Sequence, residues 1–177
     1  MRIEIPDPAL ILLIGPSGAG KSTFAARHFR ATEIVSSDRC RAMLCDDEAN
    51  QAVSAAAFSL LHHIARDRLA LGRLTVIDAT NLQARARIPL LRMAAALRLP
   101  TAAIVFNPRL ETCLAHNRAR PDRFVIEDVL REHLDALHRT LPQLAAEGYV
   151  GISLLDESNF SDIEVHRTVR DASHSGE

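Results

Sequence analysis

Residues 15–23 have the types and spacing that suit the binding of phosphate groups. They read Gly-Pro-Ser-Gly-Ala-Gly-Lys-Ser-Thr, which matches the pattern GxxxxGK[ST]. Glycines at these positions allow the backbone to turn so that successive N–H groups point inward at phosphate oxygens. An apolar stretch precedes the pattern and a helix-forming stretch follows it, which is the strand–loop–helix setting that the pattern requires. The sequence therefore predicts a site for a nucleoside triphosphate.

Two side chains of this loop have separate predicted tasks. Lys21 would reach the β- and γ-phosphates of ATP, and the hydroxyl group of Ser22 would bind Mg²⁺. Lys21 is the single lysine of a chain that otherwise uses arginine, so a compact ammonium group stands where a planar guanidinium group fits less well. The residues of the loop that we predict to contact ATP are Gly15, Ser17, Gly18, Ala19, Gly20, Lys21, Ser22 and Thr23.

A carboxylate and a guanidinium group lie one helical turn apart in the segment IVSSDRCR, residues 34–41. Serine followed by Asp38 is typical of a helix start, because both stabilise the first turn. Capping alone does not account for Arg41, which would share a helix face with Asp38. If the preceding apolar residues form a strand parallel to the first one, both side chains point into the cleft beside the phosphate loop. Asp38 could then accept the proton of an attacking hydroxyl group, and Arg41 could pair with it or bind an anionic acceptor.

Two features of the sequence argue against nucleotide hydrolysis. A GTPase normally carries the motif NKxD, which is impossible in a chain whose one lysine is Lys21. Asp78 is followed by Ala79, whereas many ATPases place a water-activating glutamate after the acid at this strand end. Asp78 itself fits either a strand-end cap or a role near the metal. Transfer of the γ-phosphate to a bound acceptor therefore fits the sequence better than hydrolysis.

Alternating apolar and helical segments must position these residues. Such alternation is typical of an α/β fold, in which a parallel sheet of about five strands has helices on both faces. Ligands of these folds bind at the carboxyl ends of the strands. The predicted strands are residues 9–14, 33–36, 74–77, 102–106 and 148–155, and the predicted helices begin near residue 24 and cover 50–71, 85–97, 110–118 and 126–141.

The composition indicates a single globular domain. The chain has 177 residues, of which 47% are hydrophobic and 24% charged, and it can bury a substantial core. No apolar run approaches the roughly 20 residues needed to span a bilayer, and the first residues lack the layout of a signal peptide. The cysteines form no disulfide or zinc pattern. We therefore expect a cytoplasmic protein with no membrane partner.

The charge distribution gives a weaker signal. A net charge of −1 provides no overall basic field for coating a nucleic acid. Residues 81–100 nevertheless contain four arginines and no acid. This local excess fits either a phosphate-facing patch or a solvated helix face.

Five segments, taken in order, resemble the kinase module of bacterial polynucleotide kinase-phosphatase, and the resemblance runs from about Ile3 to Arg167. That module is the amino-terminal part of an RNA-repair enzyme that also carries phosphatase and ligase modules. The resemblance implies transfer of the ATP γ-phosphate to a 5′-hydroxyl end of RNA or DNA. The segments are GPSGAGKSTFAARHF (15–29), VSSDRCR (35–41), DDEANQAVSAAAFSLLHHI (46–64), LTVIDATN (74–81) and NRARPDR (117–123).

The resemblance implies a catalytic set of four residues. Lys21 would contact ATP, and Asp38 would be the general base. Arg41 would bind the phosphate beside the terminal nucleoside of the acceptor. Arg123 would neutralise charge on the phosphate that is being transferred.

Further pocket residues are implied in the same way. Gln51 and Thr80 would contact the acceptor, and Arg120 would belong to a helical lid over the triphosphate. The sequence departs from the module at His116, where an arginine is usual. Either Arg118 or Arg120 would then supply that charge, or the affinity for the nucleotide would be lower.

We therefore predict one P-loop kinase domain over residues 1–170, followed by a polar tail or linker at 171–177, with phosphatase and ligase modules fused in a longer chain. Two other functions use the same phosphate loop. A small-molecule kinase would phosphorylate a sugar, an antibiotic or a nucleotide sugar, although Arg41 favours an anionic acceptor. A non-catalytic nucleotide-binding module would serve in regulation or assembly, although Lys21, Ser22 and Asp38 are all present.

Overall fold

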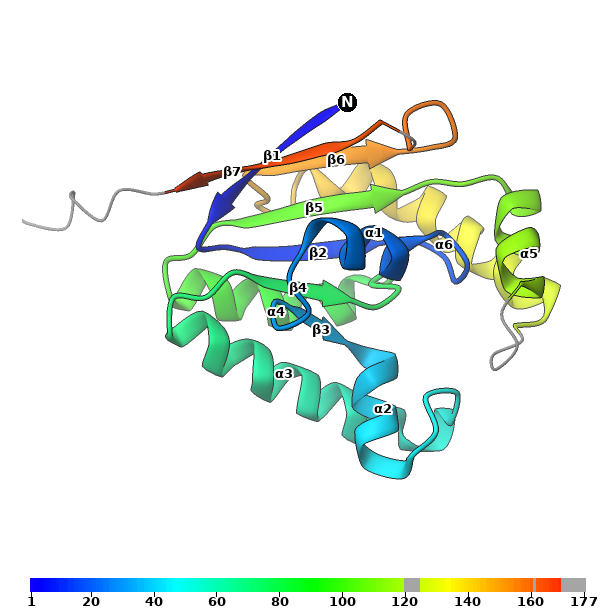
Figure 1. The fold of residues 1–177 in the computed structure, drawn as a ribbon, viewed down its shortest axis with the longest axis horizontal. Helices are drawn as coiled ribbons and strands as arrows, with labels where there is room; N and C mark the ends of the chain where they lie inside the picture. Colours follow the sequence, from blue (N-terminus) through cyan, green and yellow to red (C-terminus); the bar gives the residue numbers. More distant parts are fainter. Residues whose placement is uncertain (120–124, 161, 170–177) are drawn as a thin grey trace, which may run out of the picture.

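A parallel five-stranded sheet lies at the centre of the computed structural model, which describes residues 1–119, 125–160 and 162–169 (Figure 1). Each hydrogen-bonded pair of neighbouring strands in this sheet is parallel. The predicted α/β fold with about five parallel strands and helices on both faces is thereby confirmed. From one edge to the other, the strands are β3 (Ile34–Ser36), β4 (Thr75–Asp78), β2 (Leu10–Ile14), β5 (Thr101–Phe106) and β6 (Gly151–Leu155).

Helices connect the strands of this sheet, and two of them differ from the prediction. A short 3₁₀ turn, η1 (Gln51–Val53), precedes α3, because the side chain of Asn50 accepts a hydrogen bond from the Ala52 N–H group. The last helix continues past Pro142, since the proline removes one backbone bond near the helix end while Leu144 reaches the core. Within the described ranges, no helix combines the length and apolar character needed to cross a membrane. The helices are α1 (Lys21–His28), α2 (Ser37–Cys45), α3 (Ser54–Ala70), α4 (Ala84–Ala96), α5 (Leu110–Arg118) and α6 (Glu127–Leu144).

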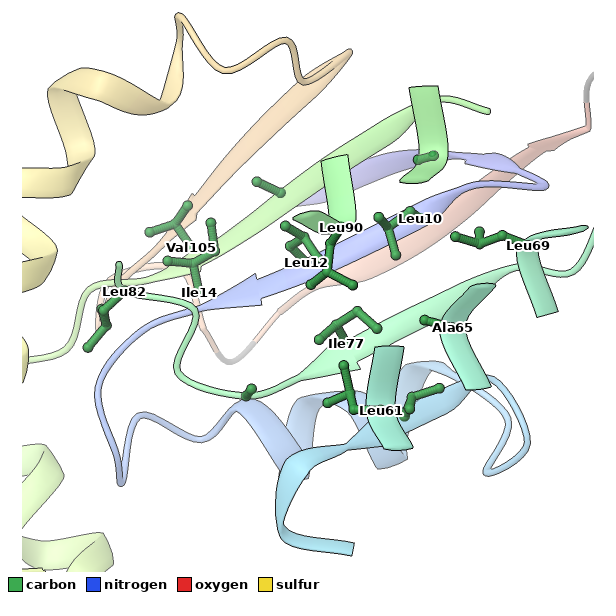
Figure 2. Close-up of a cluster of buried hydrophobic side chains, with 14 of the residues drawn as sticks. Leu10, Leu12, Ile14, Leu61, Ala65, Leu69, Ile77, Leu82, Leu90 and Val105 are labelled. Atoms are coloured by element: carbon green, nitrogen blue, oxygen red, sulfur yellow. The ribbon is translucent and has the colours of Figure 1, made fainter. Parts of the chain in front are cut away.

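The two faces of the sheet pack against different partners. Leu10, Leu12 and Ile14 of β2 lie in a cluster with buried residues of α3 and α4 (Figure 2). Leu137 and Leu144 of α6 belong to the same cluster. Ile11 and Leu13 point to the opposite face, which α1 covers. All five residues of β2 are buried, as expected for the central strand of a sheet with both faces covered.

A second, two-stranded sheet pairs β1 (Arg2–Asp7) with β7 (Glu164–Val169) in parallel. Ile3 and Ile5 of β1 are buried in the same core as α1, so this sheet extends the cover of that face. Both guanidinium ends of Arg167 donate to Glu33, each at 2.8 Å, and fasten β7 to the segment before β3. Burial opposes the charged form of Glu33, yet the bonds from Arg167 hold its pKa below the usual value. The sequence pattern did not predict this sheet.

A fully buried arginine, Arg87, holds the loop between β4 and α4. Its Nη1 donates to the carbonyl oxygens of Asn81 (2.8 Å) and Leu82 (2.9 Å). Its Nε donates to a carboxylate oxygen of Glu147 at 2.8 Å, and Nη2 bonds to the other oxygen. The side chain of Asn81 donates to the Leu13 carbonyl at 2.8 Å and ties the same loop to β2. This loop therefore has a fixed backbone at the carboxyl end of the sheet.

Candidate active site

The phosphate-binding loop that the sequence predicts joins β2 to α1. Gly18 and Gly20 have φ angles of 76° and 86°, which glycine adopts without steric cost. Nζ of Lys21 donates to the carbonyl oxygens of Gly15 (3.0 Å) and Pro16 (2.7 Å). The loop therefore wraps around the ammonium group, which lies at the start of α1.

Residues from two helices contact this loop from outside. Nδ1 of His116 on α5 lies 2.7 Å from the carbonyl oxygen of Gly18. Because a carbonyl oxygen only accepts, the imidazole donates in this contact. The backbone N–H of Ser17 donates to Nδ1 of His133 on α6 at 3.4 Å. His116 thus binds the loop backbone.

Gly18 allows α5 to approach the loop closely. A Cβ atom at this position would lie 2.7 Å from the backbone oxygen of Cys113, which cannot move without the helix. Burial raises the pKa of the Cys113 thiol to about 11, so this group remains protonated at neutral pH. Cys113 therefore fills space under the loop and supplies no nucleophile.

We expect Gly18→Ala to lower the stability of the fold by about 1–3 kcal/mol, because the variant combines an unfavourable φ with a backbone clash. In thermal unfolding, each kcal/mol of lost stability should lower the Tm by about 2–4 °C. Gly72→Ala is the matched control, since Gly72 has a φ of +64° and no atom within 4 Å of the added Cβ. If the two variants lost the same stability, the clash with Cys113 would make no contribution, and the unfavourable φ alone would explain the loss.

A cleft with a volume of about 290 Å³ opens beside the loop, at the carboxyl ends of β3 and β4. The arrowheads of β4 and β5 point toward the end of the sheet where α2 and α5 lie (Figure 1). The cleft brings together residues from the phosphate loop, the start of α2, the η1–α3 segment, the end of β4 and α6. Predicted residues that line it are Ser17, Gly18, Ala19, Gly20, Lys21, Ser22, Asp38, Arg41, Gln51 and Thr80.

Two predicted residues of the described part of the chain, Gly15 and Thr23, are not among those that line the cleft. Gly15 lies beneath the loop, where a Cβ atom would meet the Phe106 carbonyl oxygen at 2.7 Å. Thr23 lies on α1, beyond the residues of the loop that face the cleft. Arg120 and Arg123, with the tail at 171–177, lie outside the described residues.

Asp38 and Arg41 form an ion pair in the cleft, with Nη1 of Arg41 at 2.5 Å from Oδ1 of Asp38. Arg41 is 5% exposed, and its Nε donates to the hydroxyl oxygen of Ser54 at 3.2 Å. Ser54 in turn donates to the Gln51 side-chain oxygen at 3.2 Å. This chain of contacts fixes the carboxylate from the side of α3. The N-cap of α2 is Ser36, whose side chain accepts from the Arg39 N–H group.

Several residues of the cleft carry no sequence signal. Ser54 and Phe58 lie on α3 and His133 on α6, and all three line the cleft. They occur in ordinary helical segments, and only the packing of those helices brings them to the phosphate loop. Asp78, for which the sequence left two roles open, is the last residue of β4 and lines the cleft as well.

The residues present fit a Mg²⁺ ion that is bound mainly through substrate phosphates. Ser22 offers a hydroxyl oxygen, and Asp38 and Asp78 offer carboxylates in the same cleft. No cluster of three His, Cys, Asp or Glu side chains suited to a metal occurs in the part of the chain that the structure describes. Mg²⁺ seldom uses such a cage, because it keeps waters and binds one or two carboxylates together with phosphates.

A second cavity, of about 310 Å³, lies on the other side of the phosphate loop. Ala19, Phe106 and Phe160 line it, together with His116 of α5. The Phe160 ring closes over Gly20, where a Cβ atom would lie 3.0 Å from Cζ. Aromatic walls of this kind suit a flat ring such as a nucleobase.

Comparisons with solved structures identify the same fold in proteins of different function. A chain of the Pnkp1/Rnl/Hen1 RNA repair complex aligns with a TM-score of 0.68 at 22% identity, covering 79% of this chain and 47% of that one. Kti12 of Chaetomium thermophilum in complex with ADP-AlF3 gives 0.62 at 14% identity, with 84% and 89% covered. A gluconokinase from Sinorhizobium meliloti 1021 gives 0.52 at 18%, with 86% and 84% covered.

The present chain spans about half the length of the matched chain in the RNA repair complex. At these identities the likeness concerns the fold alone. No curated protein matches the sequence. Residues 10–144, from β2 to the end of α6, match the AAA domain family, and the chain belongs to that family.

Proposed function

We propose that the protein is an ATP-dependent polynucleotide 5′-hydroxyl kinase that acts in the healing of broken nucleic-acid ends. The observation that carries this proposal is that Asp38 and Lys21 line one cleft of about 290 Å³. A carboxylate and a phosphate-binding lysine in one cleft are the parts needed to move a phosphoryl group onto a hydroxyl group.

In the proposed reaction, the Asp38 carboxylate accepts the proton of the 5′-hydroxyl group while the hydroxyl oxygen bonds to the γ-phosphorus of ATP. The bond between the γ-phosphorus and the β,γ-bridging oxygen breaks, and ADP leaves with the electron pair. Lys21 neutralises charge on the β- and γ-phosphates. Mg²⁺, held by Ser22 and a cleft carboxylate, would add charge neutralisation at the phosphate oxygens. By resemblance, Arg123 and Arg120 are proposed to assist at the triphosphate.

Two observations support a polynucleotide as the acceptor. Arg41 is buried beside Asp38, so a cationic group lies next to the proposed base, where a phosphate of the acceptor chain can bind. The ordered motifs of the chain resemble a polynucleotide kinase module, and a chain of an RNA repair complex shares the fold. Gln51 and Thr80 line the cleft and are proposed to contact the terminal nucleoside.

The test is transfer of radiolabelled γ-phosphate from ATP to an oligonucleotide with a 5′-hydroxyl end. We expect a labelled 5′-phosphate product and no label on an oligonucleotide that already carries a 5′-phosphate. A panel of sugars and antibiotics serves as the competing set of acceptors. If a folded, ATP-binding sample labelled one of these and no oligonucleotide, the small-molecule kinase would be the correct function.

A further inference from the structure

A groove of about 770 Å³ adjoins the cleft and lies between α3 and α6, over the start of α4. Phe58, Thr80 and His133 line both the cleft and the groove, so a ligand can pass from one to the other. The motifs that predict the P-loop and the general base do not account for this groove. Its other lining residues include His62, Arg85, Glu132, Asp135 and Arg139.

The relative volumes of the cleft and the groove bear on the size of the acceptor. The cleft of about 290 Å³ has to contain the reacting phosphate groups together with the attacking hydroxyl group. The groove beyond Thr80 has a volume of about 770 Å³, more than twice as large. An acceptor whose body extends well beyond its reacting hydroxyl group would fill the groove, whereas a small metabolite would leave it unused.

The charges of the groove come from two helices. Arg85 on α4 and Arg139 on α6 are exposed, and neither makes an ion pair or hydrogen bond with another described residue. Glu132 and Asp135 on α6 bring two carboxylates to the same groove. Burial lowers the pKa of His62, so this side chain is neutral at physiological pH. The groove therefore offers separate cationic and anionic positions beside the aromatic ring of Phe58.

We propose that this groove binds the acceptor strand beyond its terminal nucleoside, and that the preferred acceptor is a single strand of several nucleotides rather than a mononucleotide. The proposal rests on the proposed function, since it assigns the path of that same acceptor. Arg85 and Arg139 bind backbone phosphates as the strand leaves the cleft past Thr80. Phe58 provides a surface for a base, as in other single-strand sites that combine cationic and aromatic side chains. Glu132 and Asp135 accept hydrogen bonds from exocyclic amino groups of bases.

The test compares the double variant Arg85→Ala/Arg139→Ala with Arg92→Ala/Arg131→Ala. The control removes one exposed arginine from each of the same two helices, and neither Arg92 nor Arg131 lines the groove. A 3′-fluorescent oligonucleotide with a 5′-hydroxyl end is titrated with each protein in the presence of a non-hydrolysable ATP analogue, over a series of salt concentrations. Transfer to the same oligonucleotide and to a nucleoside 3′-monophosphate is measured in parallel.

We expect the groove variant to raise the Kd for the oligonucleotide about ten-fold. The slope of log Kd against log salt should fall by about 1.4, since each lost contact to a single strand removes about 0.7. The ratio of kcat/KM for the oligonucleotide to that for the nucleoside 3′-monophosphate should fall towards one, while the control keeps the wild-type ratio.

The groove variant could keep the wild-type Kd and salt slope while the wild-type protein labels oligonucleotides normally. That result would refute the proposal that the groove binds the acceptor strand and would leave the proposed function intact. Equal effects of the two double variants would also refute the groove proposal, because arginines anywhere on α4 and α6 would then contribute equally to oligonucleotide binding. If the wild-type protein labelled no oligonucleotide, the proposed function would fail and the groove assignment with it.

Discussion

Replacing Asp38 with asparagine is expected to reduce phosphoryl transfer by about 10²–10⁴-fold while ATP still binds. Asparagine keeps the shape of the side chain and its hydrogen-bonding capacity, but it does not accept the proton of the hydroxyl group. The contacts of Lys21 with the phosphate loop do not involve residue 38, so the nucleotide site should persist. Single-turnover transfer and binding of a fluorescent ATP analogue would measure the two properties separately.

Asp67→Asn is the control for Asp38→Asn. Asp67 is also a carboxylate next to an arginine, with Oδ1 3.2 Å from Nε of Arg66, but it lies on the exposed side of α3 away from the cleft. Its replacement should leave transfer unchanged. If Asp38→Asn lost ATP binding to the same extent as transfer, Asp38 would be a structural residue that holds Arg41 in place.

Replacing Arg87 with methionine is expected to lower the free energy of unfolding by about 3–5 kcal/mol, as is typical when one partner of a buried ion pair is removed. The variant leaves the carboxylate of Glu147 without its cation in a site where that side chain is 14% exposed. It also removes the donors to the carbonyl oxygens of Asn81 and Leu82. Urea unfolding monitored by circular dichroism measures the loss.

The double variant Arg87→Met/Glu147→Leu distinguishes the effect of an unpaired Glu147 carboxylate from the effect of the lost hydrogen bonds to the loop. We expect it to recover part of the lost stability, because no charge remains unpaired, while the two loop carbonyl oxygens still lack donors. The KM for the acceptor should rise in both variants, since the released loop carries Thr80. A loss of less than about 1 kcal/mol in Arg87→Met would show that water replaces the guanidinium group easily.

The central sheet could be predicted because each of its strands carries a local signal. The apolar run before Gly15 has the character of a strand buried on both faces, and β2 is buried along its whole length. The paired strands β1 and β7 have no continuous apolar run, although residues 2–5 of β1 alternate between polar and apolar. Each has few apolar residues, and each is defined by a partner at the other end of the chain, for example Ile3 opposite Val165. Register between distant segments depends on the assembled core, which no local pattern contains.

The residues of the candidate site also form two groups: those in short sequence motifs and those that helix packing brings to the site. Lys21, Asp38 and Arg41 belong to short motifs, in which neighbouring positions fix one another through a loop or a helical turn. His133 reaches the phosphate loop only because α6 packs across the sheet, and its sequence surroundings are those of any amphipathic helix. The contact of His116 with Gly18 likewise depends on how α5 is placed. The residues that helix packing brings to the site could therefore not be predicted from the sequence.

The pairing of β1 with β7 sets an order for folding during synthesis. Arg2 and Ile3 leave the ribosome before the strands of the central sheet, yet their partners Glu164 and Val165 are made after all the elements that form the candidate site. Until then, Ile3 and Ile5 lie on a strand without its hydrogen-bonded partner, and one apolar face of the nascent sheet lacks part of its cover. Contacts between such distant segments form slowly. A ribosome that stalls between α6 and β7 would therefore present a chain with the whole phosphate loop but an exposed apolar face, which is the kind of surface that chaperones bind.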